Sequence, residues 1–221
     1  MRESSTELPT LVAHTIRDDT AVRHLHKYTN RNPLQRVTLG RFFTRLAAIM
    51  RAEMESAGPD ASVFEFGCGE GFLLRELKSR GFTARDLVGI DLREQAISEA
   101  RTLHPEFKFE CVNLFDWSPP HTQFDVVLAS QVLEHIPQPA AVLKKLIELT
   151  AGSLILTVPC EPWFQLLNLA RGRDIARLGN HPEHINRWSK RSFEKFVSKH
   201  ARILSSEVEF PFIVVQAVTL R

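Results

Sequence analysis

The apolar residues of this chain recur with two different spacings, and the change between the spacings predicts its elements. A helical period predicts a helix over residues 34–56, which Gly58-Pro59 ends. Short apolar runs predict strands near 62–66, 86–90, 107–112, 124–130 and 152–158. Helical periods between those runs predict helices near 71–80, 94–103 and 139–150. Strands and helices therefore alternate, which is typical of an α/β fold.

The predicted strands lack a strict apolar and polar alternation, as expected for a parallel sheet with helices on both faces. After residue 160 the alternation of predicted strands and helices is interrupted. Residues 161–187 predict an insertion over the strand ends, and Ser189 predicts the start of another helix. Final strands near 203–209 and 213–220 predict a hairpin with its turn at Pro211.

Composition narrows the possible classes of protein. A length of 221 residues suits one domain, and a net charge of +2 does not by itself indicate a nucleic-acid partner. No apolar run is long enough to span a bilayer, and no signal-peptide segment is visible. The three cysteines form no C-x-x-C pair, which favours a cytoplasmic protein without a disulfide framework or zinc site.

Three glycines at alternate positions follow the first predicted strand and precede a helix. Such a turn lets a ligand approach the backbone and the helix N-terminus closely. Asp91, which ends the second strand about 20 residues later, suits a ribose diol. The spacing G-x-G-x-G differs from the dinucleotide pattern, and Glu65 and Glu70 would repel a pyrophosphate but tolerate an ammonium or sulfonium. Together these features predict a nucleoside site.

The segment VFEFGCGEGFLL, residues 63–74, resembles the first motif of class I S-adenosylmethionine-dependent methyltransferases. FDVVLASQVLEHI, residues 124–136, resembles the fourth strand of that family and its loop. The resemblance covers residues 60–160 and implies a Rossmann-like fold, with seven mostly parallel strands, an antiparallel last strand and helices on both faces. It also implies an N-terminal helical lid over residues 1–58. A cofactor-binding domain over 59–221 would carry the substrate-covering insertion near 161–188.

The resemblance implies S-adenosylmethionine as cofactor and S-adenosylhomocysteine as product. Gly67 and Gly69 would lie against the methionine portion, with Cys68 as a small residue between them. Glu65, where the family usually has Asp, would meet the ammonium, or would be a charge buried against a basic group. Asp91 would bind the ribose or cap a helix. The full expected set is Glu65, Gly67, Cys68, Gly69, Asp91, Leu92, Asn113, Leu114, Ser130 and Gln131.

Three positions in that set have more specific expected roles. Asn113 and Leu114 align with the family's adenine-binding pair, although Asn113 departs from the usual acidic residue and Asp116 is a competing choice. An amide oxygen can still accept from the adenine amino group. Leu92 and Phe115 would supply apolar faces to the ring. Ser130, Gln131 and Val132 would line the floor near the methionine portion and the reacting methyl.

Three histidines are candidate catalytic bases: His135 in the LEHI turn, and His181 and His184 in the HPEHIN stretch. His135 could instead be a structural histidine, and the HPEHIN stretch could be a polar loop. We expect no metal here, because Pro182 limits a helical arrangement of the two later histidines.

The similarity to quinone-biosynthesis O-methyltransferases favours methyl transfer to a hydroxyl of a small-molecule acceptor, by direct in-line displacement. The alternatives are N- or C-methylation of a small metabolite, or a non-catalytic S-adenosylmethionine-binding regulatory protein. No D/N-P-P-Y motif follows the fourth predicted strand, which disfavours a nucleic-acid substrate. The sequence sets no oligomeric state.

Overall fold

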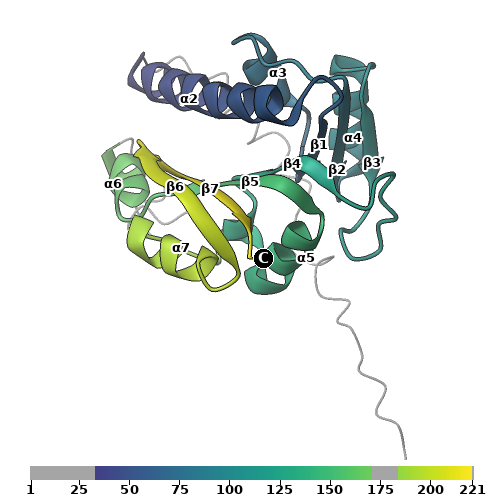
Figure 1. Cartoon of the computed structure of the whole chain (residues 1–221). Helices are drawn as coiled ribbons and strands as arrows, with labels where there is room; N and C mark the ends of the chain where they lie inside the picture. Colours follow the sequence, from purple (N-terminus) through teal and green to yellow (C-terminus); the bar gives the residue numbers. More distant parts are fainter. Residues whose placement is uncertain (1–32, 171–183, 221) are drawn as a thin grey trace, which may run out of the picture.

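The structure, a computed structural model, describes residues 33–170 and 184–220. The described residues form a seven-stranded sheet with the order β3-β2-β1-β4-β5-β7-β6 (Figure 1). Its strands are β1 (Ser62–Phe66), β2 (Asp86–Asp91), β3 (Lys108–Cys111), β4 (Phe124–Ser130), β5 (Thr150–Pro159), β6 (Ala201–Glu209) and β7 (Phe212–Thr219). β1 to β5 run parallel, and β7 is antiparallel to both β5 and β6. The predicted mostly parallel sheet with an antiparallel last strand is confirmed.

The helices follow the predicted order, with one that the sequence did not predict. They are α2 (Pro33–Ala57), α3 (Phe72–Lys78), α4 (Glu94–Leu103), the 3₁₀ turn η1 (Leu133–His135), α5 (Pro139–Glu148), α6 (Trp163–Ala170) and α7 (Lys190–Val197). α6 lies inside the predicted insertion. It is only eight residues long, and its two polar positions, Gln165 and Asn168, are too few to establish a helical period.

The sheet has helices on both faces, as predicted, and alternate residues of each strand divide between two cores. Val126 and Leu128 of β4 belong to the core under α2, α3 and α4. Val127 and Ala129 belong to the core under α5 and α7. Successive side chains of a strand point to opposite faces, and burial on both faces explains why β4 reads as a continuous apolar run.

α2 is a layer of this fold. Leu46 and Met50 on its inner face are completely buried and pack in one core with strands β1, β4, β5 and β7. Figure 1 shows α2 lying across the sheet beside α3. The predicted boundary at residue 58 and the lid function of residues 1–58 stay predictions, and residues 1–32 lie outside the described chain. Within 33–170 and 184–220, no helix combines the length and apolarity that crossing a membrane requires.

Candidate functional site

The glycine loop turns sharply at the carboxyl end of β1. Gly67 and Gly69 have positive φ angles of 71° and 55°, a region that L side chains rarely adopt. A Cβ on Gly67 would lie 2.5 Å from Cγ2 of Val132. The amides of Gly67 and Cys68 both donate to the carbonyl of Ile90, at 2.8 and 3.1 Å, which holds the loop against the end of β2. Glycine is therefore required at Gly67 for both backbone angle and space.

Asp91 lies beside this loop but is already surrounded by donors of the chain. Its Oδ2 accepts from the amide of Gly69 at 3.0 Å, and its Oδ1 accepts from the amide of Arg93 at 3.0 Å. The Arg93 guanidinium adds bonds at 3.2 and 3.5 Å and also pairs with Glu70 at 3.0 Å. The N-cap of α4 is Arg93 rather than Asp91. Sequence reasoning missed Arg93, whose position two residues after Asp91 was the available signal.

Glu65 ends up buried in β1, only 4% exposed. Among the described residues it has no basic partner that forms an ion pair, so the alternative of a charge buried against a cation finds no support there. Burial, and secondarily the nearby charge of Asp91, raises the pKa of Glu65 to about 8. A cation that a ligand brings would stabilise the ionised form of such a buried carboxyl group.

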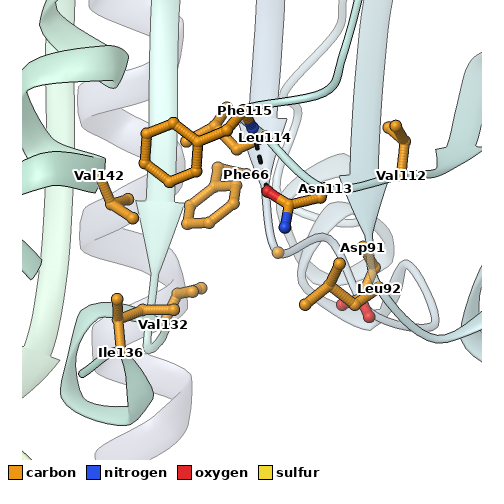
Figure 2. Close-up of a pocket in the computed structure, with 11 residues that line it drawn as sticks. Phe66, Asp91, Leu92, Val112, Asn113, Leu114, Phe115, Val132, Ile136 and Val142 are labelled. Atoms are coloured by element: carbon orange, nitrogen blue, oxygen red, sulfur yellow. Dashed lines mark hydrogen bonds between the residues drawn. The ribbon is translucent and has the colours of Figure 1, made fainter. Parts of the chain in front are cut away.

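A largely apolar pocket opens at the ends of β1, β2 and β3 (Figure 2). It brings together Gly67, Asp91, Leu92, Asn113 and Leu114 of the expected set. The pocket also includes Phe115 and Val132, which the sequence predicts beside the ring and on the floor. The lining residues that the sequence left unassigned are Phe66, Val112, Ile136 and Val142. Such a pocket suits a flat apolar ring with a polar edge. Asp116, the competing choice for the adenine end, is not among the lining residues.

Asn113 has a fixed orientation in this pocket. Its Oδ1 accepts from the amide of Phe115 at 3.0 Å, a local turn that Figure 2 shows as a dashed line. One lone pair of the amide oxygen is therefore already used, which leaves the second lone pair and the NH₂ group for a ligand. This side chain can both donate to and accept from the edge of a purine.

Ser130 and Gln131 follow β4 and are both held by Thr157 of β5. The hydroxyls of Ser130 and Thr157 lie 2.8 Å apart, and Nε2 of Gln131 donates to the Thr157 hydroxyl at 3.1 Å. Gln131 has a φ of 58°, the one positive φ among the non-glycine residues that the structure describes. Such a conformation costs on the order of 1–3 kcal/mol and persists where surrounding bonds impose it. Thr157 was not identified from the sequence.

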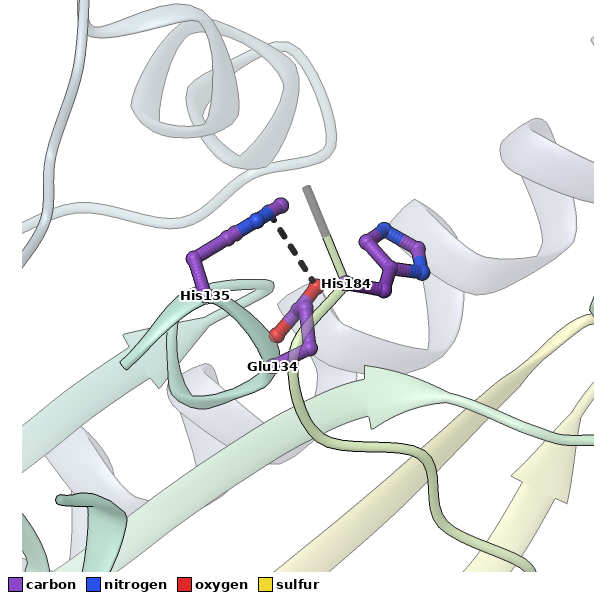
Figure 3. A group of neighbouring side chains, drawn as sticks. All are labelled: Glu134, His135 and His184. Carbon is purple, nitrogen blue, oxygen red and sulfur yellow. Dashed lines mark ion pairs between the residues drawn. The ribbon is translucent and has the colours of Figure 1, made fainter. Parts of the chain in front are cut away.

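The turn η1 and the segment after residue 183 bring Glu134, His135 and His184 together (Figure 3). The imidazole rings of His135 and His184 are 5.1 Å apart, and Nε2 of His135 is 3.9 Å from Oε1 of Glu134. Glu134 and His184 are 1% and 5% exposed. His181 lies outside the described residues. The cluster can accept a proton, and its ligand atoms, all within 4.8 Å of one another, also form a donor set suited to a divalent cation.

Residues 33–200 match the model of the methyltransferase domain family. The chain belongs to this family. It carries a methyltransferase domain, and S-adenosylmethionine is the cofactor that the glycine loop and Asp91 indicated. The residues of the pocket fit this cofactor, because the loop at Gly67 leaves no room for a Cβ and the pocket joins an apolar wall to polar edges.

Two kinds of curated relative are similar to this methyltransferase. A ubiquinone biosynthesis O-methyltransferase of Neisseria meningitidis is 37% identical over 37% of the chain and 36% of the relative, and one of Psychrobacter cryohalolentis is 31% identical over 60% and 54%. A trans-aconitate 2-methyltransferase of Sinorhizobium medicae is 34% identical over 46% and 39%. The matches thus span about a third to a half of the relatives' length.

Solved structures share the fold. Magnesium protoporphyrin IX methyltransferase of Synechocystis PCC 6803, with bound SAH, superposes with a TM-score of 0.66 at 20% identity, covering 91% of this chain and 94% of that one. The plantazolicin methyltransferase BpumL, also with SAH, gives 0.67 at 16% identity, covering 92% and 91%. At these identities the likeness concerns the fold alone.

Proposed function

We propose that this methyltransferase methylates a hydroxyl oxygen of a small-molecule acceptor, and that His135 or His184 takes the hydroxyl proton. The observation that carries the proposal is that the turn after β4, which bears His135, lies against the segment that bears His184. Val132 and Ile136 of that turn line the cofactor pocket, while His135 lies beside His184. One short turn therefore joins the cofactor end to a cluster of potential bases.

The proposed cofactor contacts follow the lining of the pocket. Leu92, Asn113 and Leu114 hold the adenine, with Asn113 providing the polar edge. Asp91 meets the ribose after its guanidinium partner shifts, because Arg93 occupies the same oxygens. Glu65, Gly67, Cys68 and Gly69 face the methionine portion, and Ser130 and Gln131 form the floor beside it. The buried carboxyl of Glu65 then pairs with the ammonium.

When bound, S-adenosylmethionine supplies an activated methyl group on a sulfonium. The chain's own contribution is to orient the acceptor, exclude water and accept a proton. The Glu134 carboxylate lies 3.9 Å from Nε2 of His135. Removal of the acceptor proton by such a positioned base contributes roughly 10²- to 10⁴-fold in rate.

The similarity to ubiquinone biosynthesis O-methyltransferases supports a hydroxyl acceptor, although it covers only part of each protein. N- or C-methylation of a small metabolite is the alternative. A non-catalytic role in binding the cofactor is the weaker alternative, because the base cluster has no function in it. The balance of 28 basic and 26 acidic residues supports a partner other than nucleic acid, and cysteines without a C-x-x-C pair support a cytoplasmic location.

The test combines an acceptor screen with three histidine variants. Purified protein is offered phenols, catechols and amines with labelled cofactor, and S-adenosylhomocysteine affinity is measured by calorimetry. We expect labelled methyl on oxygen. His135→Gln and His184→Gln should retain S-adenosylhomocysteine affinity, and at least one should lose turnover by roughly 100-fold.

His121→Gln is the matched control. His121 pairs with Asp86 at the amino end of β2, whereas the histidine cluster lies beyond the carboxyl end of β4. This variant should keep both affinity and turnover. Methylation of amines only would replace the hydroxyl proposal by the alternative. Full turnover in both His135→Gln and His184→Gln would remove the base assignment.

A further inference from the structure

We propose that Asn186 is the positioning residue of the acceptor end, because its side chain fastens the segment carrying His184 to the turn carrying His135. The proposal rests on the function proposed above, in which these histidines act on the acceptor. It concerns a residue that acts through the backbone carbonyls of η1 and of Ile136, the residue that follows it.

Four hydrogen bonds carry the proposal. Both N–H groups of the Asn186 amide are used: Nδ2 donates to the carbonyl of Leu133 at 3.0 Å and to that of Ile136 at 2.6 Å. The backbone amides of Ile185 and Asn186 donate to the carbonyl of Glu134, at 2.8 and 3.0 Å. Two consecutive residues therefore satisfy three carbonyls of one 3₁₀ turn.

Within the turn, the Leu133 carbonyl accepts from the Ile136 amide at 3.3 Å. Buried carbonyls at the end of a helical turn also need donors from outside the turn. Leu133 is completely buried and Ile136 is 8% exposed, so water is a poor substitute at these two positions. Only a side-chain NH₂ group can offer two hydrogens from one atom to two carbonyls while it keeps no charge. An aspartate in place of Asn186 has the same shape and offers none.

The fastening determines where His184 lies. His184 stands two residues before Asn186, and the centre of its ring lies 5.1 Å from the ring centres of both His135 and Phe164. On the other side of Asn186, Trp188 forms a bridge to Cys160, and its carbonyl accepts from the amide of Glu161 at 2.8 Å. The segment 184–188 is thus tied to η1 at one end and to the end of β5 at the other.

The same bonds reach the cofactor pocket. Ile136, whose carbonyl receives the shortest of the four bonds, also lines that pocket. Asn186 therefore connects the segment bearing His184 to the wall against which the cofactor binds. A loss of this connection should change the acceptor step and spare most of the cofactor affinity.

The test compares Asn186→Asp with Gln123→Glu. In the control position, Nε2 of Gln123 also donates to a backbone carbonyl, that of Glu148 at 3.1 Å, at the loop before β4. Both variants exchange an NH₂ group for an oxygen. Four quantities are measured: backbone amide exchange over residues 184–188, S-adenosylhomocysteine affinity, kcat and KM for a catechol probe, and the pH profile of kcat.

For Asn186→Asp we expect faster exchange at the Ile185 and Asn186 amides. We also expect a loss of kcat by roughly tenfold or more, the scale of losing two buried hydrogen bonds. The pH profile should shift, because His184 no longer lies against His135. S-adenosylhomocysteine affinity should change by less than about threefold, and Gln123→Glu should match the wild type in all four quantities. Unchanged kcat and pH profile in Asn186→Asp would overturn the proposal.

Two further measurements separate the possible failures. If Asn186→Asp does not fold, Asn186→Ser removes the NH₂ group without adding a charge. Faster exchange and a lower kcat would support the proposal, and wild-type values of both would overturn it. The imidazole NMR signal of His184 needs no acceptor. If it shifts in Asn186→Asp while the wild type methylates no hydroxyl probe, the hydroxyl proposal fails but the positioning by Asn186 stands.

Discussion

Four N–H groups already reach the carboxylate of Asp91, two on each oxygen. A carboxylate accepts about four hydrogen bonds, so a ribose hydroxyl must share or displace one of these donors. The longest contact, 3.5 Å from Nη2 of Arg93, is the weakest of the four. Glu70 pairs with the same guanidinium at 3.0 Å, so Arg93 keeps one ion-pair partner when its bonds to Asp91 break.

The Arg93 pairing predicts a defined stability pattern. Arg93→Gln leaves the Glu70 carboxylate, 7% exposed, without its cation, and an unpaired buried charge costs about 3–5 kcal/mol, somewhat less here because Arg93 is partly exposed. Adding Glu70→Gln removes that charge and should restore most of the loss. Urea unfolding of the single and double variants measures the effect, and equal losses in both would show that the pair is not coupled.

Glu65 makes stability depend on pH. Its pKa in the folded protein, about 8, lies above the ordinary value, so the protonated carboxyl favours the folded state. The free energy of unfolding should therefore fall as the pH rises from about 5 to 8, at about 1.4 kcal/mol for each unit of pKa shift. Above that window, the contribution of Glu65 stays constant.

The comparison of Glu65→Gln with the wild type isolates this effect, because all other groups titrate alike in both. Urea midpoints at several pH values between 5 and 9 should fall less steeply for the variant. Parallel curves would mean that the Glu65 carboxyl is already ionised in the folded protein. In the same window, S-adenosylhomocysteine binding to the wild type should release a proton, since an ammonium stabilises the carboxylate.

At the scale of elements, α2 contributes a buried apolar face rather than a loose cover. Phe42, Leu46 and Met50 lie in the core that contains strands β4, β5 and β7. Arg45 on its outer side forms an ion pair with Glu207 of β6. The helix begins at Pro33 and ends before Gly58, whose φ of 102° terminates it.

Truncation of α2 side chains tests this role. Met50→Ala should lower the free energy of unfolding by about 2–5 kcal/mol, because Met50 is completely buried. Val37→Ala, on the same helix but 60% exposed, should change it by less than about 0.5 kcal/mol. If Met50→Ala unfolds at the wild-type urea concentration, α2 is separable from the sheet and the lid interpretation gains support.

At the scale of the whole molecule, the parallel register brings the cofactor residues together. Phe66 of β1 pairs with Ile90 of β2 and with Ala129 of β4. The residues that follow these three strand ends therefore lie side by side at one edge of the sheet, which is where open α/β sheets bind ligands. The glycine loop, Asp91 and Gln131 meet for this reason.

The cluster of Glu134, His135 and His184 has two possible chemistries, and metal removal separates them. We expect turnover to survive dialysis against EDTA, because the proposed role of the imidazoles is to accept a proton. The measurement is methyl transfer to the catechol probe before and after chelation. Loss of turnover that Mn²⁺ or Zn²⁺ restores would instead assign the cluster to a divalent cation.

The sequence alone determined the order and type of nearly all elements, since apolar period depends on which faces are buried. It also placed the glycines, Asp91 and the residues after β4 at strand termini, where the pocket lies, and their roles toward the cofactor stay predictions. α6 was not predicted because eight residues with two polar positions are too few to establish a helical period. Local patterns carry this kind of information well.

Only the tertiary structure decided which side chains meet across long separations. Arg93 pairs with Glu70, 23 positions earlier, Thr157 holds Gln131, and Asn186 reaches carbonyls 50 and 53 positions earlier in the chain. None of these contacts leaves a periodic trace, because each depends on how strands and turns pack rather than on neighbouring residues. The cofactor end of the site was therefore readable from the chain, whereas the arrangement of the acceptor end followed from the fold.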